Sequence, residues 1–316
     1  MRQLLEFEKP IAELEAQLDE LRTSAVANGN HSVAQEAAVL TAKIDRQLGG
    51  IYAKLTPWQK TQVARHPERP KALAFIKELF TDYTPLAGDR AFAEDAAIVG
   101  GLARFRGQPV MVIGTEKGTD LDSRLKHNFG SARPEGYRKA RRLIELACRF
   151  RLPIITFVDT AGAFPGIDAE ARGQAEAIAR SIEACLAATT PIIAIIIGEG
   201  GSGGAIALAS GDRVLMLEHA IYSVISPEGC ASILWRDAAC APQAAEAMRI
   251  TAEDLKSLKL IDGIIAEPPG GAHRNPQQAI RSVGDAIAAA LPKLVAMDPA
   301  ALRSRRREKF LAMGRE

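Results

Sequence analysis

The hydrophobic pattern of the chain changes its period near residue 86. Before this point, apolar residues recur at spacings of three and four, which predicts two amphipathic helices. The apolar positions are Ile11, Leu14, Leu18 and Leu21, followed by Leu40, Ile44, Leu48, Ile51 and Leu55. Between the two stripes, the letters NGN at 28–30 predict a turn. The sequence therefore predicts an α-helical hairpin, which either packs on the core of its own chain or grips another chain.

From residue 86 onward, short β-rich runs alternate with helical segments. The runs read AIVGGLARF, PVMVIGTE, PIITFVDT, PIIAIIIG, RVLMLE and AIYSVIS. Several of them are apolar on both faces, which is typical of buried, largely parallel strands in a layered α/β domain. We expect a helical arm at 1–85, an α/β domain at 86–296 and a helical tail at 297–316.

Two arginine-rich helical segments are expected to face water. In PEGYRKARRLIELACRF, one face carries Tyr137, Ala140, Ile144 and Ala147 and would pack on the sheet, while Arg138, Arg142 and Arg149 would be solvated. The basic cluster at 303–307 lies in the tail and is interpreted as a solubilising end.

The composition is that of an ordinary folded protein, with 47% hydrophobic and 25% charged residues and a formal net charge of +2 over 316 residues. A charge so close to neutral does not indicate a nucleic-acid partner. The chain has no run of about 18 apolar residues, and its N-terminus carries acidic residues where a signal peptide would be basic and then apolar. We therefore expect a cytoplasmic protein with no membrane partner.

The four cysteines, Cys148, Cys185, Cys230 and Cys240, form no CxxC pair. They lie in apolar or helical contexts, which favours structural thiols over a zinc site or disulfides. No metal is expected in this chain.

The glycine-rich stretch GEGGSGGAIA follows the run PIIAIIIG and matches several short motifs. Gly198, Gly200 and Gly203 spell the GxGxxG of dinucleotide-binding proteins, but Glu218 follows too early and the helix is too short for a crossover. A phosphate-binding loop would need Lys and then Ser or Thr directly after its last glycine, and neither is present. Both nucleotide-binding motifs are therefore incomplete.

The same stretch also matches GxSxG, the strand-to-helix turn that exposes a serine nucleophile, with Ser202 at its centre. Possible partners follow in a workable order, namely Asp212, His219, Asp237, Asp262 and His273. The simpler interpretation is that Ser202 is the N-cap of the next helix.

Backbone chemistry offers a further explanation for the glycines. A buried strand that ends in glycines and opens a helix leaves N–H groups unpaired at the positive end of the helix dipole. Such groups stabilise a developing oxyanion or enolate without any side chain. The segment FVDTAGAFPG, about forty residues earlier, also runs from a buried strand into a glycine-containing loop that precedes a helix. We expect the two loops to line a substrate channel. Asp159, at the end of that earlier strand, would cap its own loop or position the substrate.

Several long blocks of sequence resemble the α subunit of bacterial acetyl-CoA carboxylase carboxyltransferase. They are FVDTAGAFPG, GEGGSGGAIA, YSVISPEGCASILW and LKLIDGIIAEPPGGAHRNP, with ARHPERP, LAGDRAFAEDAAIVGG and NFGSARPEGYRKA as further matches. The resemblance covers nearly the whole chain, including the N-terminal arm. Matches of this length are far more specific than the short motifs.

The resemblance implies a crotonase-like (ClpP/crotonase) α/β fold of repeated ββα units with an N-terminal α-helical hairpin. It implies an enzyme that transfers the carboxyl group of carboxybiotin to acetyl-CoA, giving malonyl-CoA in the first committed step of fatty acid synthesis. Biotin would be attached to a biotin carboxyl carrier protein and carboxylated by a partner biotin carboxylase that uses ATP. A β subunit with a zinc ribbon would complete an α2β2 complex.

The resemblance also implies roles for individual residues. The α chain is thought to hold the biotin, with Gly203 and Gly204 as oxyanion donors and Gly200 and Gly201 shaping their loop. The residues that would line the biotin approach are Gly162, Ala163, Phe164, Pro165 and Gly166. The loop usually reads DTPGAYPG in this family, so Ala161 and Phe164 stand where Pro and Tyr are usual. Any contact from a tyrosine hydroxyl would be absent here.

Two functions of other classes remain as alternatives. One is a crotonase-fold serine hydrolase that uses Ser202. The other is a non-catalytic scaffold subunit that docks the carrier protein.

Overall fold

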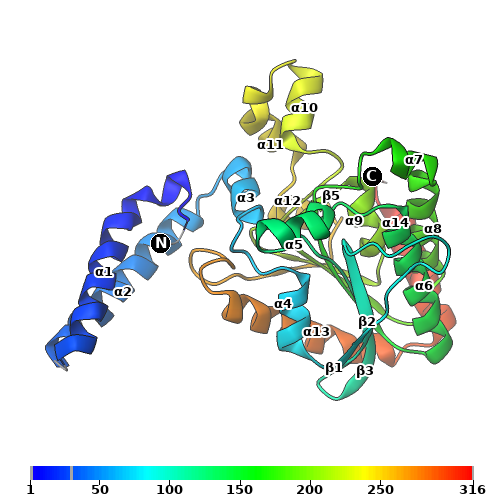
Figure 1. Cartoon of the computed structure of the whole chain (residues 1–316), viewed down its shortest axis with the longest axis horizontal. Coiled ribbons are helices and arrows are strands. Elements are labelled where there is room, and N and C mark those ends of the chain that lie inside the picture. The colour runs from blue at the N-terminus through cyan, green and yellow to red at the C-terminus, as the bar shows by residue number, and fades with distance from the viewer. Residues whose placement is uncertain (1–2, 29–30, 315–316) are drawn as a thin grey trace.

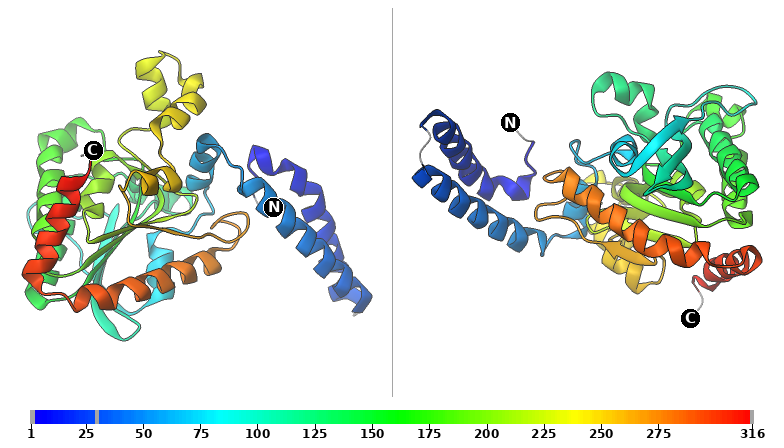
Figure 2. Two further views of the ribbon diagram at one scale, coloured as in Figure 1. Left: turned by 180° about the vertical axis from the view of Figure 1, so that it is seen from behind. Right: turned by 90° about the horizontal axis from the view of Figure 1, so that it is seen from below.

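The computed structural model describes residues 3–28 and 31–314 of the chain. Figure 1 shows an arm of two helices, a twisted sheet covered by helices, and a small pair of helices, α10 and α11, that stands off the sheet. In Figure 2 the arm extends away from the body, and the C-terminal helix lies on the opposite side of the body.

The sheet has eight strands in the order β1-β2-β3-β4-β5-β6-β8, with β7 paired to β5. The strands are β1 Phe80–Pro85, β2 Ile98–Phe105, β3 Gln108–Thr115, β4 Ile154–Thr160, β5 Ile192–Gly201, β6 Arg213–Leu217, β7 Ile221–Ser223 and β8 Gly263–Ile265. The six predicted runs are all confirmed as strands. Strand β1 was missed because it is a mostly exposed edge strand with polar residues, and β8 because it has three residues.

Most of the sheet is parallel, as predicted. β1, β2 and β3 pair antiparallel, whereas β4, β5, β6, β7 and β8 join the sheet through parallel pairs. Every residue of β4 and of β5 is buried, which explains their continuous apolar sequences. Because parallel strands run in the same direction, the carboxyl ends of β4 and β5 meet at one edge, where Thr160 pairs with Gly200.

Helices form the arm and cover the sheet. They are α1 Lys9–Asn28, α2 His31–Tyr52, α3 Pro57–Ala64, α4 Ala72–Leu79, α5 Leu121–Lys126, α6 Pro134–Phe150, α7 Ile167–Ala171, α8 Gln174–Ala187, α9 Ser202–Ala209, α10 Pro227–Leu234, α11 Ala241–Met248, α12 Ala252–Ser257, α13 Pro276–Val295 and α14 Pro299–Ala312. Short 3-10 helices are η1 Glu6–Glu8, η2 Asn128–Gly130 and η3 Ala238–Cys240. Helices α6, α8 and α9 pack together on the sheet, and α4 packs on α13.

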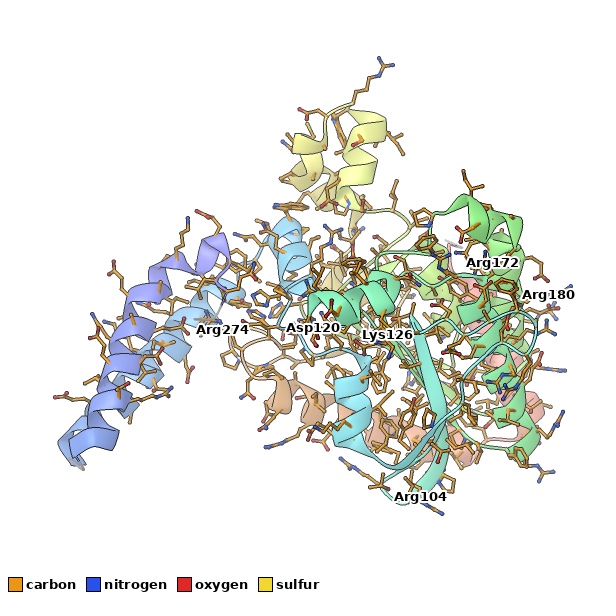
Figure 3. All side chains as sticks on the ribbon, viewed as in Figure 1. Arg104, Asp120, Lys126, Arg172, Arg180 and Arg274 are labelled. Carbon is orange, nitrogen blue, oxygen red and sulfur yellow. The ribbon has the colours of Figure 1, made fainter. Side chains whose placement is uncertain are left out.

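The predicted helical hairpin is confirmed as the arm, because α1 and α2 pack on each other. Ile11, Leu18, Ile44 and Leu48 are buried between them. Residues 29 and 30 of the predicted turn lie outside the described part of the chain. At the root of the arm, Arg274 donates to Glu8 over 2.8 Å; Figure 3 labels this arginine between the arm and the body. Whether the arm also grips another chain stays a prediction.

The expectation that the arginines of α6 are solvated was wrong for two of them. Arg138 donates to Asp89 over 2.7 Å, and Arg142 donates to the carbonyl oxygens of Leu86 and Gly88. Arg149 is exposed. The two half-buried arginines therefore fasten the loop before β2 onto α6.

The basic cluster of the tail is also more than a solubilising end. Arg306 is 1% exposed and forms a two-pronged pair with Asp212, with nitrogen to oxygen distances of 2.9 and 2.6 Å. Its remaining nitrogen donates to the carbonyl oxygens of Cys185 and Ala188. The pair joins α14 to the body. Only the tertiary structure could separate this arginine from its solvated neighbours.

Candidate active site

Strand β5 ends in glycines that stay within the sheet. The strand continues beyond the predicted end at Gly198 to Gly201, and both Gly200 and Gly201 pair with β7. A Cβ on Gly200 would lie 2.9 Å from the ring of Tyr222. These two glycines were expected to shape a loop; they are strand residues instead, because β7 extends the pairing of β5.

Helix α9 opens directly after β5. Gly203 and Gly204 lie in its first turn, where N–H groups have no acceptor within the helix. Within the described part of the chain, neither N–H donates to the backbone of a loop or of another strand. Gly203 is half-buried and Gly204 is buried. The buried strand, the glycines and the short helix thus follow one another as predicted.

The two glycine segments are in direct contact. A Cβ on Gly201 would overlap the carbonyl group of Ala161, and a Cβ on Gly204 would lie 3.0 Å from the backbone nitrogen of Ala163. Because these neighbours are backbone atoms, they cannot move aside cheaply. Glycine is required at both positions by the close approach of the two segments.

Side chains hold the first loop in place. Gly162 has φ of 147°, a conformation that favours glycine. The guanidinium of Arg133 lies 4.0 Å from the ring centroid of Phe164, a distance suited to a cation–π contact. The amide of Gln174 donates to the carbonyl oxygens of Phe164 and Ala132 over 3.0 and 2.9 Å. Phe164, which stands where Tyr is usual in the family, is therefore a half-buried side chain that packs against Arg133.

Ser202 is not the helix N-cap that its sequence context favoured. The N-cap position belongs to Gly201, and no side chain caps the helix. Ser202 has φ of 53°, which is uncommon for a residue with a side chain. This left-handed residue at a sharp strand-to-helix turn has the backbone shape of the GxSxG motif.

The partners that a serine nucleophile needs lie elsewhere. Asp212 pairs with Arg306, and Asp262 pairs with Lys309 over 2.9 Å. His219 packs edge-on against Tyr52, and His273 stacks on His66 at the root of the arm. Asp237 caps η3. Among the described residues, no hydrogen bond joins Ser202 to any of these side chains.

A buried charged network underlies the glycine segments. The carboxylate of Asp159 accepts the N–H of Glu199 over 2.9 Å and pairs with Lys117 over 2.7 Å and Lys71 over 3.7 Å. Burial alone would raise the pKa of Asp159, but the two lysines and the N–H donor lower that pKa to about 2. Burial opposes the charge on Lys117, yet Asp159 and Glu199 raise its pKa. Asp159 therefore joins β4 to β5, rather than capping its own loop.

Arg65 links this network to helix α10. It contacts Glu199 over 2.7 Å and Glu228 over 2.6 Å. The pKa of Arg65 is raised: burial would lower it, but the two carboxylates outweigh that effect. No short motif in the sequence points to Arg65, Lys117 or Glu199 as site residues. Arg65 and Glu199 do belong to the blocks ARHPERP and GEGGSGGAIA, which carry the family resemblance.

In residues 3–28 and 31–314, no group of three or more His, Cys, Asp and Glu side chains could hold a metal ion. No helix in the same ranges is long and apolar enough to cross a membrane.

Comparison with known proteins gives the family. Residues 4–314 match the family model for acetyl co-enzyme A carboxylase carboxyltransferase-like proteins. The chain is 68% identical over 314 residues to the acetyl-coenzyme A carboxylase carboxyl transferase subunit alpha of Acidiphilium cryptum, covering 99% of this chain and 98% of that protein. It is 65% identical over 316 residues to the corresponding subunit of Gluconacetobacter diazotrophicus, covering 100% and 99%.

Solved structures agree on the fold. The transcarboxylase 12S core matches with a TM-score of 0.57 at 19% identity, over 70% of this chain and 41% of that chain. A Pseudomonas malonate decarboxylase hetero-dimer matches with a TM-score of 0.53 at 16% identity, over 68% and 91%. The predicted crotonase-like α/β fold with an N-terminal helical pair is confirmed. The chain belongs to the family of acetyl-CoA carboxylase carboxyltransferase α subunits, and it is the α subunit of that carboxyltransferase.

Proposed function

We propose that this subunit supplies the main-chain donors for carboxyl transfer from a carboxybiotin-bearing carrier protein to acetyl-CoA, with malonyl-CoA as the product. Carboxybiotin supplies the carboxyl group and, after its release, a ureido nitrogen that accepts the proton from acetyl-CoA. The observation that carries the proposal is the contact between two glycine segments, one of which presents first-turn N–H groups without backbone acceptors.

In this proposal, Gly203 and Gly204 donate their N–H groups to the ureido oxygen of biotin. The positive end of the α9 dipole lies behind these groups and favours the negative charge that develops there. A Cβ on Gly203 would meet only Ile178, at 3.4 Å, so this half-buried position is open to a planar group. Gly200 and Gly201 fix the end of β5, from which α9 starts.

The loop Gly162, Ala163, Phe164, Pro165 and Gly166 lines the biotin approach in this proposal. All of these residues except Pro165 are half-buried, and Pro165 is exposed. Arg133 packs on the ring of Phe164 in this loop, 4.0 Å from the ring centroid. This loop offers no tyrosine hydroxyl, so contacts to biotin from here are apolar or come from the backbone.

Acetyl-CoA, the second reactant, has to be bound by another chain in this proposal. As an α subunit this chain works with partner subunits, and we place acetyl-CoA on a β subunit with a zinc ribbon in an α2β2 complex. The biotin carboxyl carrier protein and the ATP-using biotin carboxylase supply the donor. The purified α chain alone should form no malonyl-CoA, and adding the β subunit should restore the activity. Turnover by the isolated chain would contradict a divided site.

A direct test replaces one peptide N–H by an ester oxygen. Glycolic acid incorporated in place of Gly203 or Gly204 deletes the N–H and adds no atoms near Tyr137 or Ala163. Loss of one oxyanion donor typically lowers turnover by about 100- to 1000-fold. The same replacement at Gly107, in the turn between β2 and β3, is the control. Normal turnover by both site esters would overturn the donor assignment and favour a scaffold role.

A serine hydrolase is the second candidate because of the left-handed conformation of Ser202. It predicts covalent labelling of Ser202 by fluorophosphonates and complete loss of activity in Ser202→Ala. The carboxyltransferase predicts neither result.

A further inference from the structure

Strand β5 contains a bulge just before the glycines of the candidate site. Its pairing with β4 is regular up to Ile196, and it resumes where Thr160 pairs with Gly200. Between these points, Asp159 of β4 lies opposite three residues of β5, at positions 197–199. The two extra residues correspond to about 6 to 7 Å of extended strand. A regular ladder would therefore place the start of α9 that much farther beyond β4.

The bulge is also the point at which β5 changes its neighbour on the other side. Pairing with β6 ends at Ile196, and pairing with β7 begins at Glu199. Bulges bend the strand that contains them and are common next to active sites. Beyond the bulge, β5 leads directly into α9, and the two elements pack on each other at the upper edge of the sheet in Figure 1. The bulge therefore sets the position and the direction of the strand end from which α9 starts.

Two buried side chains satisfy backbone groups of the bulge. A carboxylate oxygen of Asp159 accepts the N–H of Glu199 over 2.9 Å, and the Nε of Arg69 donates to the carbonyl oxygen of Ile197 over 2.7 Å. Both side chains belong to residues that are 1% exposed. An unpaired N–H or carbonyl group in the interior is destabilising. These two contacts therefore favour the bulged strand over any arrangement that would break them.

Ion pairs and close packing fix the two side chains in turn. Arg69 forms a two-pronged pair with Glu267, over 2.9 and 2.5 Å, while Asp159 pairs with Lys117 over 2.7 Å. Gly198 lies directly against the carboxylate of Asp159, and a Cβ there would be 2.5 Å from a carboxylate oxygen. Position 198 therefore requires glycine because of the side chain that holds the bulge.

We propose that Asp159 and Arg69 are positioning residues for carboxyl transfer, because they hold the bulge that places the N–H groups of α9. Each acts on turnover through the backbone of β5 and touches no reacting group. The inference rests on the proposed function, in which Gly203 and Gly204 are the donors. A displacement of about 1 Å can lower turnover by about 100-fold. Loosening the bulge should therefore lower turnover while the binding of acetyl-CoA, on another chain, stays the same.

The test compares buried aspartates at opposite ends of β5. Asp159→Ala removes the acceptor for the N–H of Glu199, and it should lower kcat by about 10- to 100-fold with an unchanged KM for acetyl-CoA. Asp212→Ala is the matched control, because Asp212 accepts the N–H of Ile192 at the start of β5 over 2.8 Å and pairs with the buried Arg306. A purely structural role predicts equal losses in the two variants, whereas the positioning role predicts an unchanged kcat in the control.

Three further variants separate the hydrogen bonds from the charges. Asp159→Asn keeps an oxygen that can accept the N–H of Glu199, so it should retain more turnover than Asp159→Ala. Gly198→Ala keeps every charge but presses a methyl group against the carboxylate of Asp159, and it should lower kcat with an unchanged KM. Arg69→Lys keeps a positive charge but loses the Nε donor, and it should have the same effect. Gly198→Ala also carries the test if Asp159→Ala does not fold.

The kinetic constants are measured per assembled complex, with the β subunit and the carrier protein present. Equal losses of kcat in Asp159→Ala and Asp212→Ala would overturn the proposal, because the effect would then reflect stability alone. An unchanged kcat in a folded Asp159→Ala or Gly198→Ala complex would overturn it as well. Equal losses in Asp159→Asn and Asp159→Ala would assign the effect to the charge and not to the hydrogen bond, and the proposal would again be wrong.

Hydrogen exchange distinguishes a failure of this inference from a failure of the proposed function. Amide exchange of residues 197–204 should be faster in Asp159→Ala than in the unmodified chain, and equal exchange would contradict the proposal whatever the activity. The proposed function has its own readout, which is malonyl-CoA formation by the unmodified complex. If that complex forms no malonyl-CoA while Asp159→Ala exchanges faster, the function is refuted and the bulge contact stands. An active complex whose kcat and exchange do not respond to Asp159→Ala would refute the positioning role alone.

Discussion

The ends of β4 and β5 share one sequence pattern but differ in structure. β5 passes from Gly201 directly into α9 and is held between β4 and β7. β4 opens instead into a half-buried loop that includes Gly162 with φ of 147° and leads through the short α7 to α8. Glycine therefore serves two purposes: close backbone contact at the end of β5, and an unusual backbone conformation after β4.

The two strand ends are also joined beneath the surface. Asp159 of β4 accepts the N–H of Glu199 in β5, and Lys117 contacts both carboxylates, over 2.7 and 3.5 Å. This shared network makes the relative position of the two ends depend on a few buried charges.

The largest effect is expected from Lys117→Met. Removing one partner of a buried ion pair typically costs about 3 to 5 kcal/mol in the free energy of unfolding. Lys71, 3.7 Å from Asp159, still compensates part of the charge, so the loss should lie at the lower end of that range. Urea denaturation measures this loss, and Lys126→Met on the exposed end of α5 is the control. A loss below about 1 kcal/mol would mean that the buried charge of Asp159 is stabilised without Lys117.

The close contact predicts opposite outcomes at neighbouring glycines. In Gly204→Ala the new Cβ would lie 2.8 Å from the Tyr137 hydroxyl and 3.0 Å from the Ala163 nitrogen, and such overpacking typically costs about 1 to 3 kcal/mol. Gly203→Ala meets only Ile178 at 3.4 Å, so its stability should be unchanged or slightly higher. Thermal denaturation compares the two variants. Equal stability would show that the strand ends can move apart.

This contact also rules out proline as a test of the donor at position 204. Gly204 is the third residue of α9, and any Cβ there would meet the same neighbours. The ester replacement avoids the problem because it adds no side chain.

The network predicts a pH dependence of stability at the acid end. The pKa of Asp159 in the folded chain is about 2, below its ordinary value of 3.8. The stabilisation is therefore present above pH 4 and is lost as the pH falls through 2, and it amounts to about 2 kcal/mol. The free energy of unfolding should fall more steeply in the unmodified chain than in Asp159→Asn between pH 4 and 2. If the free energy of unfolding falls equally steeply with pH in both chains, the result would contradict a charged Asp159.

The smallest effect is expected at Ser202. Its φ of 53° strains a residue with a side chain by about 1 kcal/mol. Ser202→Gly should relieve that strain, although the greater freedom of the unfolded glycine chain offsets part of the gain. Ser202→Ala keeps the backbone strain, so its stability should equal that of the unmodified chain. Differential scanning calorimetry measures both, and a clear loss of stability in Ser202→Gly would show that the side chain makes a stabilising contact.

Local sequence patterns determined most of the elements. The spacing of apolar residues predicted the two arm helices, α6 and six strands, because helix and strand periods are properties of a short segment. The same patterns placed a buried strand, glycines and a short helix in order at the candidate site. The long sequence blocks identified the family.

Only the tertiary structure decided which distant residues meet. Asp159, Lys117 and Arg65 come from separate segments and form one network because the sheet brings those segments together. Likewise, Arg306 is buried against Asp212 while other arginines of its cluster are exposed. A sequence reports the chemistry of each residue, but it does not report the burial and the partner that convert an exposed charge into a buried ion pair. Ser202 shows the same limit, because β7 holds β5 in place as far as Gly201 and so gives the N-cap position to glycine.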